Sequence, residues 1–381
     1  TEGRFEGWSG RGLSLQVAGD APYPDLERRR QDGQVRAAAF LRGGELRQGA
    51  TALRGLDADA TFAGASAGWL EGLALTGSGG VNVRAAEADL AGGRARTLRV
   101  DARAPAIRWS KAGGSADLRL GGSAGRIALQ DLELRQVTAS FAGGGAFDQQ
   151  GHRLSLSGRT AAANGAWGGL GAPTAADGAE TAALKRALAA FEIQAPRMTL
   201  ASDTSGLSVR LPRPVTAVSR SGATVVVAES GAALRQGRGG VSARLQGGGL
   251  PNLDLDVPSY RLTDTGLSAT ARLRGDGDFD MFRAFNADLS GDLRLGRDGL
   301  RFLTRGCHPV SAERLELGEN DAVEVAGQLC GGAGPLFAVA GEGWRLDSRL
   351  RGVSASVPFL EAAVREASGQ LQVRGSDKGL R

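Results

Sequence analysis

The residues whose chemistry is easiest to name are the only two cysteines of the chain, Cys307 and Cys330. Between them, apolar and polar residues alternate around positions 315–317 and 323–325, which predicts the two strands of a hairpin. Such a hairpin would bring the thiols together. In an oxidising compartment they would form a disulfide that stabilises the fold by about 3 kcal/mol on chain-entropy grounds, whereas in a reducing compartment they would remain two unpaired thiols.

Two other patterns are of types that can do chemistry, but neither predicts an active site. Ser66 and Ser123 each stand in the Gly-x-Ser-x-Gly motif of serine hydrolases, yet the sequence lacks the alternating strands and helices on which that motif acts. The only histidines, His152 and His308, each lie beside an expected turn. The two cysteines and His308 offer too few ligands for zinc, at an unusual spacing. We therefore predict that the protein is not an enzyme and has no catalytic residue, cofactor or metal.

The charge pattern indicates a solvated outer face. The formal net charge is +5, a value that would normally raise the possibility of a nucleic-acid partner. Here the arginines alternate with Asp and Glu along the chain, and the one basic run, residues 28–30, is flanked by Glu27 and Asp32. Mixed charges of this kind are typical of a face that meets water. No nucleic-acid partner is predicted.

The elements that must position these residues are short stretches with an alternation of period two. Residues 98–104 (Leu-Arg-Val-Asp-Ala-Arg-Ala) and 253–257 (Leu-Asp-Leu-Asp-Val) are the clearest examples. Side chains of a strand point to opposite faces with this period, so each stretch predicts a strand with one apolar and one charged face. The fold class expected is mainly β: an elongated antiparallel β half-pipe, or repeating β-groove, with a few short helices.

Glycine is the residue that most often separates these stretches, and the 381 residues include 60 glycines. From residue 33 to residue 160 we expect strands of 5 to 9 residues separated by glycine-rich turns. The expected turns lie at 43–44, 77–80, 92–93, 113–114, 121–122 and 143–145. The alternation changes phase at Gln130 and Asp131, which predicts a turn or bulge there.

The segment after residue 160 differs in composition. Residues 161–178 are rich in Ala, Gly and Pro without periodicity, which predicts a loop, and residues 179–191 predict a helix with Leu184, Leu188 and Phe191 on one face. Two shorter helices are expected around residues 279–285 and 356–364. The expected organisation is a first β-groove segment (1–160), a loop and helix insertion (161–192) and a second β-groove segment with the cysteine hairpin (193–381), together forming one continuous unit.

The apolar strand face has two possible interpretations: a closed core, or an open trough that holds acyl chains. Alternation alone does not separate them. The candidates for an apolar groove are the apolar residues of the clearest strands. They are Leu98, Val100, Leu118, Leu120, Ile127, Leu129, Leu154, Leu156, Leu253, Leu255, Leu293 and Leu295.

Four segments around the cysteines form a distinctive series. They are 300–307 (Leu-Arg-Phe-Leu-Thr-Arg-Gly-Cys), 312–317 (Ala-Glu-Arg-Leu-Glu-Leu), 328–330 (Gln-Leu-Cys) and 334–337 (Gly-Pro-Leu-Phe). In this order they resemble the YdbH-type branch of the AsmA-like proteins. Gly331 stands where that family usually has proline. The match covers about 40 residues, from Leu300 to Phe337, and the alternating strands elsewhere are compatible with it.

The resemblance implies a periplasmic protein of a Gram-negative cell envelope that carries phospholipid between the inner and outer membranes through an apolar β-groove. It implies attachment to the inner membrane by an anchor outside this sequence, which we expect to be a fragment of a longer chain. It also suggests a small outer-membrane lipoprotein as a partner. A conduit of this kind lowers the cost of exposing lipid chains to water, about 0.8 kcal/mol per CH₂, without any chemical step.

Two alternatives stay open at this point. The first is a secreted β-solenoid of the adhesin or passenger type, with a closed core and a binding surface. Rungs of regular length or ladders of Asn and Asp would favour it, and the sequence contains neither. The second is a glycan-degrading β-solenoid enzyme, which needs a cluster of acidic residues that the sequence alone does not place.

Overall fold

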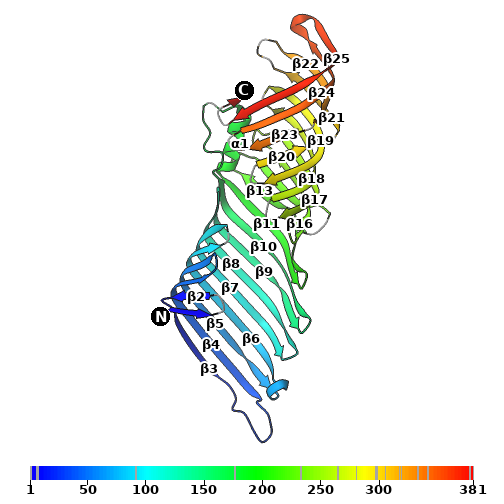
Figure 1. Cartoon of the computed structure of the whole chain (residues 1–381). Coiled ribbons are helices and arrows are strands. Elements are labelled where there is room, and N and C mark those ends of the chain that lie inside the picture. Colours follow the sequence, from blue (N-terminus) through cyan, green and yellow to red (C-terminus); the bar gives the residue numbers. More distant parts are fainter. Residues whose placement is uncertain are drawn as a thin grey trace. The chain divides into compact units, whose positions relative to one another are not determined.

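The structure, a computed structural model, confirms a mainly β, antiparallel fold (Figure 1). It describes the chain except residues 1, 6–7, 91, 176, 232–233, 264–265, 280, 297–298, 305, 317, 319, 333, 341–342, 377–378 and 381. The described residues contain 26 strands, one α-helix and two single-turn 3-10 helices. They divide into two compact units: unit 1 (Thr1–Trp167 and Glu192–Arg213) and unit 2 (Gly168–Phe191 and Pro214–Arg381).

Unit 1 is built from long antiparallel strands, and β4 to β10 each pair with the next along the chain (Figure 1). The elements are β1 (Glu2–Phe5), β2 (Trp8–Arg11), β3 (Ser14–Asp20), β4 (Gly33–Gln48), β5 (Thr51–Ala67), η1 (Leu70–Gly72), β6 (Ala74–Leu90), β7 (Gly93–Ser110), β8 (Gly113–Leu129), β9 (Leu132–Asp148), β10 (Gly151–Trp167), β11 (Phe191–Asp203) and β12 (Gly206–Arg210). The expected turn at residues 130–131 is confirmed between β8 and β9.

The strands of unit 1 are longer than the sequence predicts, because most of its glycines lie inside strands. Strands β4 to β10 have 16 to 18 residues instead of 5 to 9. The expected turns at 43–44, 77–80, 121–122 and 143–145 lie within β4, β6, β8 and β9. A Cβ atom on Gly143 would lie 1.9 Å from the carbonyl oxygen of Ser155 on β10. Glycine therefore permits close approach of neighbouring backbones here, and the expectation of turns at these positions was wrong.

A row of left-handed residues crosses unit 1 and explains a second feature of the sequence. Gly55, Thr97 and Gln136 have φ values of 61°, 55° and 52°, and they occupy corresponding positions on β5, β7 and β9. A left-handed residue inside a strand interrupts the pleat, so the alternation of faces shifts by one residue, while the register of the strand pairs continues across this line. The apolar positions on β8 accordingly change from even numbers (Leu120) to odd numbers (Ile127) while they continue one face. We call this line of left-handed residues the bulge row.

Unit 2 has shorter strands and the α-helix. Its elements are α1 (Ala179–Ala189), β13 (Val215–Ser219), β14 (Thr224–Glu229), β15 (Leu234–Arg235), β16 (Arg238–Gln246), β17 (Asn252–Thr263), β18 (Gly266–Phe279), β19 (Phe282–Gly296), β20 (Gly299–Leu303), β21 (Cys307–Leu315), β22 (Ala322–Cys330), β23 (Phe337–Ala340), β24 (Gly343–Val357), η2 (Pro358–Leu360), β25 (Ala362–Ser376) and β26 (Gly379–Leu380). Helix α1 confirms the helix predicted over 179–191.

Several local predictions in this part of the sequence were wrong. Residues 161–167 continue β10 and do not form a loop. Phe279 ends β18 and residues 282–285 begin β19, where Ala284 takes a left-handed φ of 49°. That residue shifts the alternation, so Phe282 and Phe285 are neighbours with ring centroids 5.7 Å apart although they lie in a strand. Within residues 356–364 only Pro358–Leu360 are helical, as the single turn η2, and the flanking residues belong to β24 and β25.

The buried face of α1 also differs from the prediction. Ala183 and Ala187 are its buried residues, whereas Leu184 is exposed. A Cβ atom on Gly249 would lie 3.7 Å from the Cβ of Ala183, so the helix approaches the loop before β17 closely. Only a small side chain fits at such a distance. The predicted stripe of large residues is therefore not the stripe that packs.

Candidate functional site

The apolar face of unit 1 is continuous across eight strands. Residues directly opposite on antiparallel neighbours share a face. One such row is Val17, Ala39, Ala60, Val81, Ala102, Leu120, Phe141 and Gly158, from β3 to β10. The row contains no polar residue, and at about 4.8 Å between strands it extends over about 34 Å. We call this surface the unit 1 apolar face.

The opposite face of the same strands is charged. Next to the bulge row it carries a ladder of opposing residues, namely Glu45, Arg54, Glu87, Arg96, Arg126 and Arg135. Arg54 Nη1 lies 2.8 Å from a carboxylate oxygen of Asp89, and Arg96 Nε lies 3.2 Å from one of Glu87. Hydrogen bonds from Arg94 hold the pKa of the Asp89 carboxyl below its usual value. These exposed pairs contribute little stability, but they show which face is turned toward water.

The unit 1 apolar face is exposed although its residues are apolar. The side chain of Val17 is 70% exposed and that of Val81 is 43% exposed. In a closed β-sandwich the inner side chains interdigitate with a second sheet and are removed from water. A hollow of about 380 Å³ lies on this face and is lined mainly by apolar residues, including Phe62, Val81, Ala104 and Leu118. The middle of the face is therefore an open surface that can receive an apolar ligand.

Burial on this face is deepest along the bulge row. The buried residues there are Leu56, Ala85, Ala88, Ala95 and Ala124. Almost all of them are alanines, and small side chains let the parts of a bent sheet approach each other. The unit 1 apolar face is thus closed along this line and open toward the turns at residues 111–112 and 149–150.

Eight of the predicted groove residues lie on the unit 1 apolar face. They are Leu98, Val100, Leu118, Leu120, Ile127, Leu129, Leu154 and Leu156. Leu154 and Leu156 stand opposite Gly145 and Gly143, so each large side chain lies next to a glycine, which has no side chain. Leu156 is buried, whereas Val100 and Leu129 are exposed. The structure therefore brings these residues together on one surface.

The other four candidates, Leu253, Leu255, Leu293 and Leu295, belong to unit 2, where the apolar face has a packed core. Leu255 and Leu293 pack against a buried cluster of Val257, Ala269, Ala271, Phe302 and Leu336. Leu295 lies at the margin and is exposed. The sequence analysis missed Leu336, because it lies between β22 and β23, where no alternation marks it.

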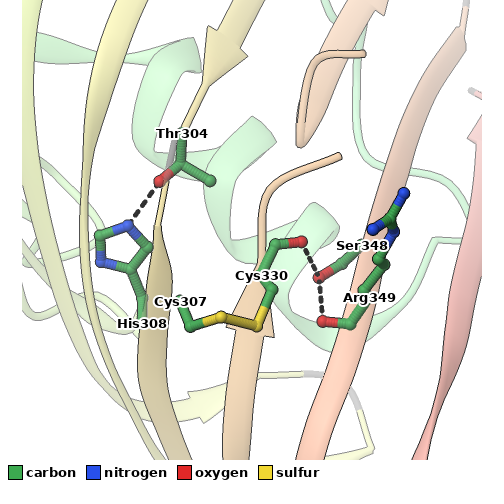
Figure 2. The surroundings of a disulfide bond; sticks show 6 residues. All are labelled: Thr304, Cys307, His308, Cys330, Ser348 and Arg349. Carbon is green, nitrogen blue, oxygen red and sulfur yellow. Dashed lines mark hydrogen bonds between the residues drawn. A yellow bond between two sulfur atoms is a disulfide. The ribbon is translucent and has the colours of Figure 1, made fainter. Parts of the chain in front are cut away.

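The two cysteines lie opposite each other at the ends of β21 and β22 and are joined as a disulfide (Figure 2). The hydroxyl of Ser348 donates a hydrogen bond to the carbonyl oxygen of Cys330 at 3.3 Å. His308 Nε2 is in contact with the hydroxyl of Thr304 (Figure 2). Among the described residues, no three His, Cys, Asp or Glu side chains gather as metal ligands would. The geometry here is that of a cross-link between strands.

The serines of the two Gly-x-Ser-x-Gly motifs are placed apart from both histidines. Ser66 lies near the end of β5, and its hydroxyl donates a hydrogen bond to the carbonyl oxygen of Gln31 at 2.6 Å. Ser123 lies within β8 on the charged face, opposite Arg99. His152 Nε2 lies 3.1 Å from the hydroxyl of Ser202. Neither motif forms the strand-turn-helix that exposes a nucleophile.

A second hollow, of about 670 Å³, lies in unit 2 and is polar. Glu180, Arg283, Glu316 and Asp321 contribute to its wall. The guanidinium of Arg283 donates two hydrogen bonds to the Glu316 carboxylate, at 2.9 and 2.7 Å, and these lower the pKa of Glu316. Since the cation is already paired, the hollow presents carboxylates and no free positive charge to an anion. The sequence carries no motif that predicts it.

Comparison with protein-family models, with curated proteins and with solved structures found no match to this chain. None of the helices in the described part of the chain has the length and apolar character needed to span a membrane. The site is therefore interpreted from its own geometry.

Proposed function

We propose that the protein is a lipid conduit, in which the unit 1 apolar face holds the acyl chains of phospholipids while they move across the periplasm between the inner and outer membranes. The observation that carries the proposal is the uninterrupted apolar row from Val17 to Gly158, which is left exposed on strands that expose charges on their other face. Exposed apolar surface of this extent marks a binding site.

The energetics favour a lipid as the occupant. Each CH₂ group taken out of water contributes about 0.8 kcal/mol, so an acyl chain gains more from a long apolar face than a small ligand does. Contact of this kind is non-directional, because the hydrophobic effect scales with area. A lipid can therefore slide from strand to strand without breaking specific bonds. No reaction is needed for transport along such a path.

The compartment is part of the proposal. A disulfide between Cys307 and Cys330 fits an oxidising compartment such as the periplasm. The resemblance of residues 300–337 to the YdbH-type AsmA-like proteins points to the same place, to an inner-membrane anchor outside this sequence and to an outer-membrane lipoprotein as a partner.

One observation favours the alternative of a secreted β-solenoid with a closed core. In unit 2 the side chains of Phe302 and Leu336 are buried in a packed cluster, as they would be in a solenoid interior. Such a core would give unit 2 a structural role and would move any binding to its surface. A closed-core solenoid does not explain why the apolar face of unit 1 is exposed.

The experiment that tests the proposal is extraction of lipid from the purified chain. The protein is expressed in a bacterial periplasm and purified without detergent, and its organic extract is analysed by mass spectrometry. We expect phospholipid in amounts comparable to the protein. The matched control is the variant Val81→Asp, in which a charge interrupts the apolar row. Absence of phospholipid from the unaltered chain, or equal amounts in both proteins, would contradict the proposal.

A further inference from the structure

One end of the unit 1 apolar face carries two exposed aromatic rings in one row, whereas the row at the opposite end carries one, Trp167 opposite Leu132. Trp109 on β7 and Phe147 on β9 stand at either side of Gly114 on β8, and His152 on β10 follows Phe147 in the same row. Trp109 is 39% exposed and Phe147 is 49% exposed. This row is the last apolar-face row before the turns at residues 111–112 and 149–150. We call it the aromatic rim.

The geometry of the aromatic rim is fixed by glycine. A Cβ atom on Gly114 would lie 2.7 Å from the ring of Phe147, so the ring lies over the bare backbone of β8. Both aromatic side chains thus remain on the surface and are not buried in a core. Trp109 is a ring with a polar tip, a type enriched where an apolar medium meets water, whereas Phe147 adds apolar contact area only.

Unpaired positive charge lies beside the aromatic rim. Arg108 and Arg153 are the neighbours of Trp109 and His152 along β7 and β10, and both are exposed. Neither guanidinium forms an ion pair with another residue in the described part of the chain. They extend from the charged face of the same strands, so a headgroup held on the apolar face reaches them around the strand ends at residues 111–112 and 149–150.

At the opposite end of the same strands the arginines are engaged in ion pairs. Near the turn at residues 130–131, Arg94 Nε lies 2.9 Å from a carboxylate oxygen of Asp89, and Arg126 and Arg135 both contact Glu133. The pKa of Glu133 is lowered, first by the hydrogen bond from Arg135, so the carboxylate stays charged. An anionic group therefore finds unmatched cations at the aromatic rim and not at this end.

From these observations we infer that lipids lie on the unit 1 apolar face with their phosphate-bearing headgroups at the aromatic rim, beside Trp109, Phe147, Arg108 and Arg153. The inference rests on the proposed function and adds to it the orientation of the lipid and a preference for a phosphate headgroup. The acyl chains then run from the rim along the strands toward the bulge row.

The lengths agree with this orientation. The hydrocarbon core of a bilayer is about 30 Å thick, so one acyl chain is about 15 Å long. At about 3.3 Å per residue, such a chain extends over four to five residues of a strand. A chain that starts at Trp109 therefore ends near Ala104, and Ala104 and Leu118 line the hollow on this face. The headgroup stays in water while the chain end occupies the hollow.

The first test compares two lipids that share their acyl chains but differ in the phosphate. Delipidated protein is loaded from vesicles that contain equal amounts of phosphatidylglycerol and diacylglycerol, and the bound lipid is measured by mass spectrometry. From two exposed charge contacts we expect a preference of about tenfold for phosphatidylglycerol, which corresponds to about 1.4 kcal/mol. The double variant Arg108→Gln/Arg153→Gln should lose this preference and retain the bound diacylglycerol.

The matched control removes two other exposed arginines. Arg84→Gln/Arg99→Gln changes the same charge on the same face, but in the middle of β6 and β7, and should keep the preference. Bound lipid with no preference, or equal loss in both double variants, overturns the headgroup assignment alone. No bound lipid in the unaltered protein overturns the proposed function as well. Melting temperatures of all variants show whether each one folds.

The second test determines which part of the bound acyl chain lies next to Trp109 of the aromatic rim. Bromine atoms on an acyl chain quench tryptophan fluorescence at short range, and the contribution of Trp109 is the difference between the unaltered protein and Trp109→Phe. We expect stronger quenching of this contribution by lipids brominated near the glycerol end than by lipids brominated near the methyl end. Stronger quenching by the methyl-end bromines would reverse the orientation and overturn the inference.

Discussion

The apolar faces of unit 1 and unit 2 follow the same sequence pattern but differ in exposure. Unit 2 has its own uninterrupted row, namely Tyr260, Ala269, Leu293, Phe302, Phe337, Leu346 and Val373. In the middle of that row Phe302 is 7% exposed, whereas Val81 in the middle of the unit 1 row is 43% exposed. Alternation determines which face of a strand is apolar, but it does not determine whether that face is covered.

The difference comes from what is available to fill the face. In unit 2, Leu336 enters the cluster from a segment outside the strands and is 1% exposed. Large rings also contribute, with Phe337 and Trp344 centroids 6.1 Å apart. The central unit 1 row is mostly Ala, Val and Gly, and a face of small side chains leaves room for a ligand. In the proposed function, unit 1 therefore provides the lipid-binding face, and the apolar face of unit 2 has a structural role.

The largest effect is expected from a cavity in the unit 2 core. Leu336→Ala should lower the free energy of unfolding by about 2–5 kcal/mol, because it leaves a void among buried neighbours. Val81→Ala in unit 1 should cost less than about 1 kcal/mol, since its side chain is already half in water. Urea unfolding followed by circular dichroism measures both. Equal losses would remove the distinction between a packed face and an open one.

The disulfide should be the next largest contribution, and only unit 2 contains it. The double variant Cys307→Ser/Cys330→Ser should lower the stability of unit 2 by about 3 kcal/mol. Without the bond between residues separated by 23 positions, the unfolded chain gains conformational entropy. Hydrogen exchange of the strands measures each unit separately. Protection should fall in β17 to β24 and stay unchanged in β4 to β10. A matching loss in β4 to β10 would show that the two units unfold together.

A smaller, pH-dependent contribution is expected from Asp288 in unit 2. Hydrogen bonds from Arg272 lower the pKa of its carboxyl to about 2. The resulting stability is present above the ordinary pKa of 3.8 and is lost as the pH falls through about 2. The Asp288 side chain is 32% exposed, so solvent screens its ion pair. We therefore expect the free energy of unfolding to fall by about 1 kcal/mol when the carboxylate is protonated.

Acid unfolding measures this contribution. The free energy of unfolding of the unaltered chain should fall more steeply between about pH 4 and pH 2 than that of Asp288→Asn, in which the titrating group is absent. Parallel curves for the two proteins would show that the pair with Arg272 does not stabilise the folded state.

The smallest effect on stability is expected from a charge placed on the open face. Val81→Asp should cost less than about 1 kcal/mol, because water reaches the position and hydrates the carboxylate. It should nevertheless reduce lipid binding strongly, since it interrupts the apolar row. Ser78→Asp, on the other face of the same strand, should leave both properties unchanged. A large loss of stability in Val81→Asp would indicate that the face is closed.

Much of the fold follows from the sequence. Period two predicts the strands, their two faces and the turn at residues 130–131, and the spacing of Cys307 and Cys330 predicts the hairpin that joins them. Glycine was misinterpreted, because its usual role in turns hides its role at close approaches such as Gly143. The bulge row was missed because left-handed residues such as Thr97 and Gln136 carry no local signature.

The candidate site was predictable only in part. The alternation identifies residues such as Leu120 and Leu255 equally well, yet the first lies on an open face and the second against a packed core. The difference depends on Leu336, which reaches the cluster from outside the alternating segments. Contacts of this kind arise from tertiary structure. The aromatic rim was likewise invisible, because Trp109 and Phe147 become neighbours only through the register of β7, β8 and β9.

The most direct test of the account is photo-crosslinking at adjacent residues of β8. A photoreactive amino acid replaces either Leu120, on the unit 1 apolar face, or Arg119, on the charged face, and lipid adducts are detected by mass spectrometry after irradiation in cells. The account predicts phospholipid adducts at position 120 and none at position 119. Equal capture at the two positions, or none at position 120, would contradict the claim that this face carries lipid.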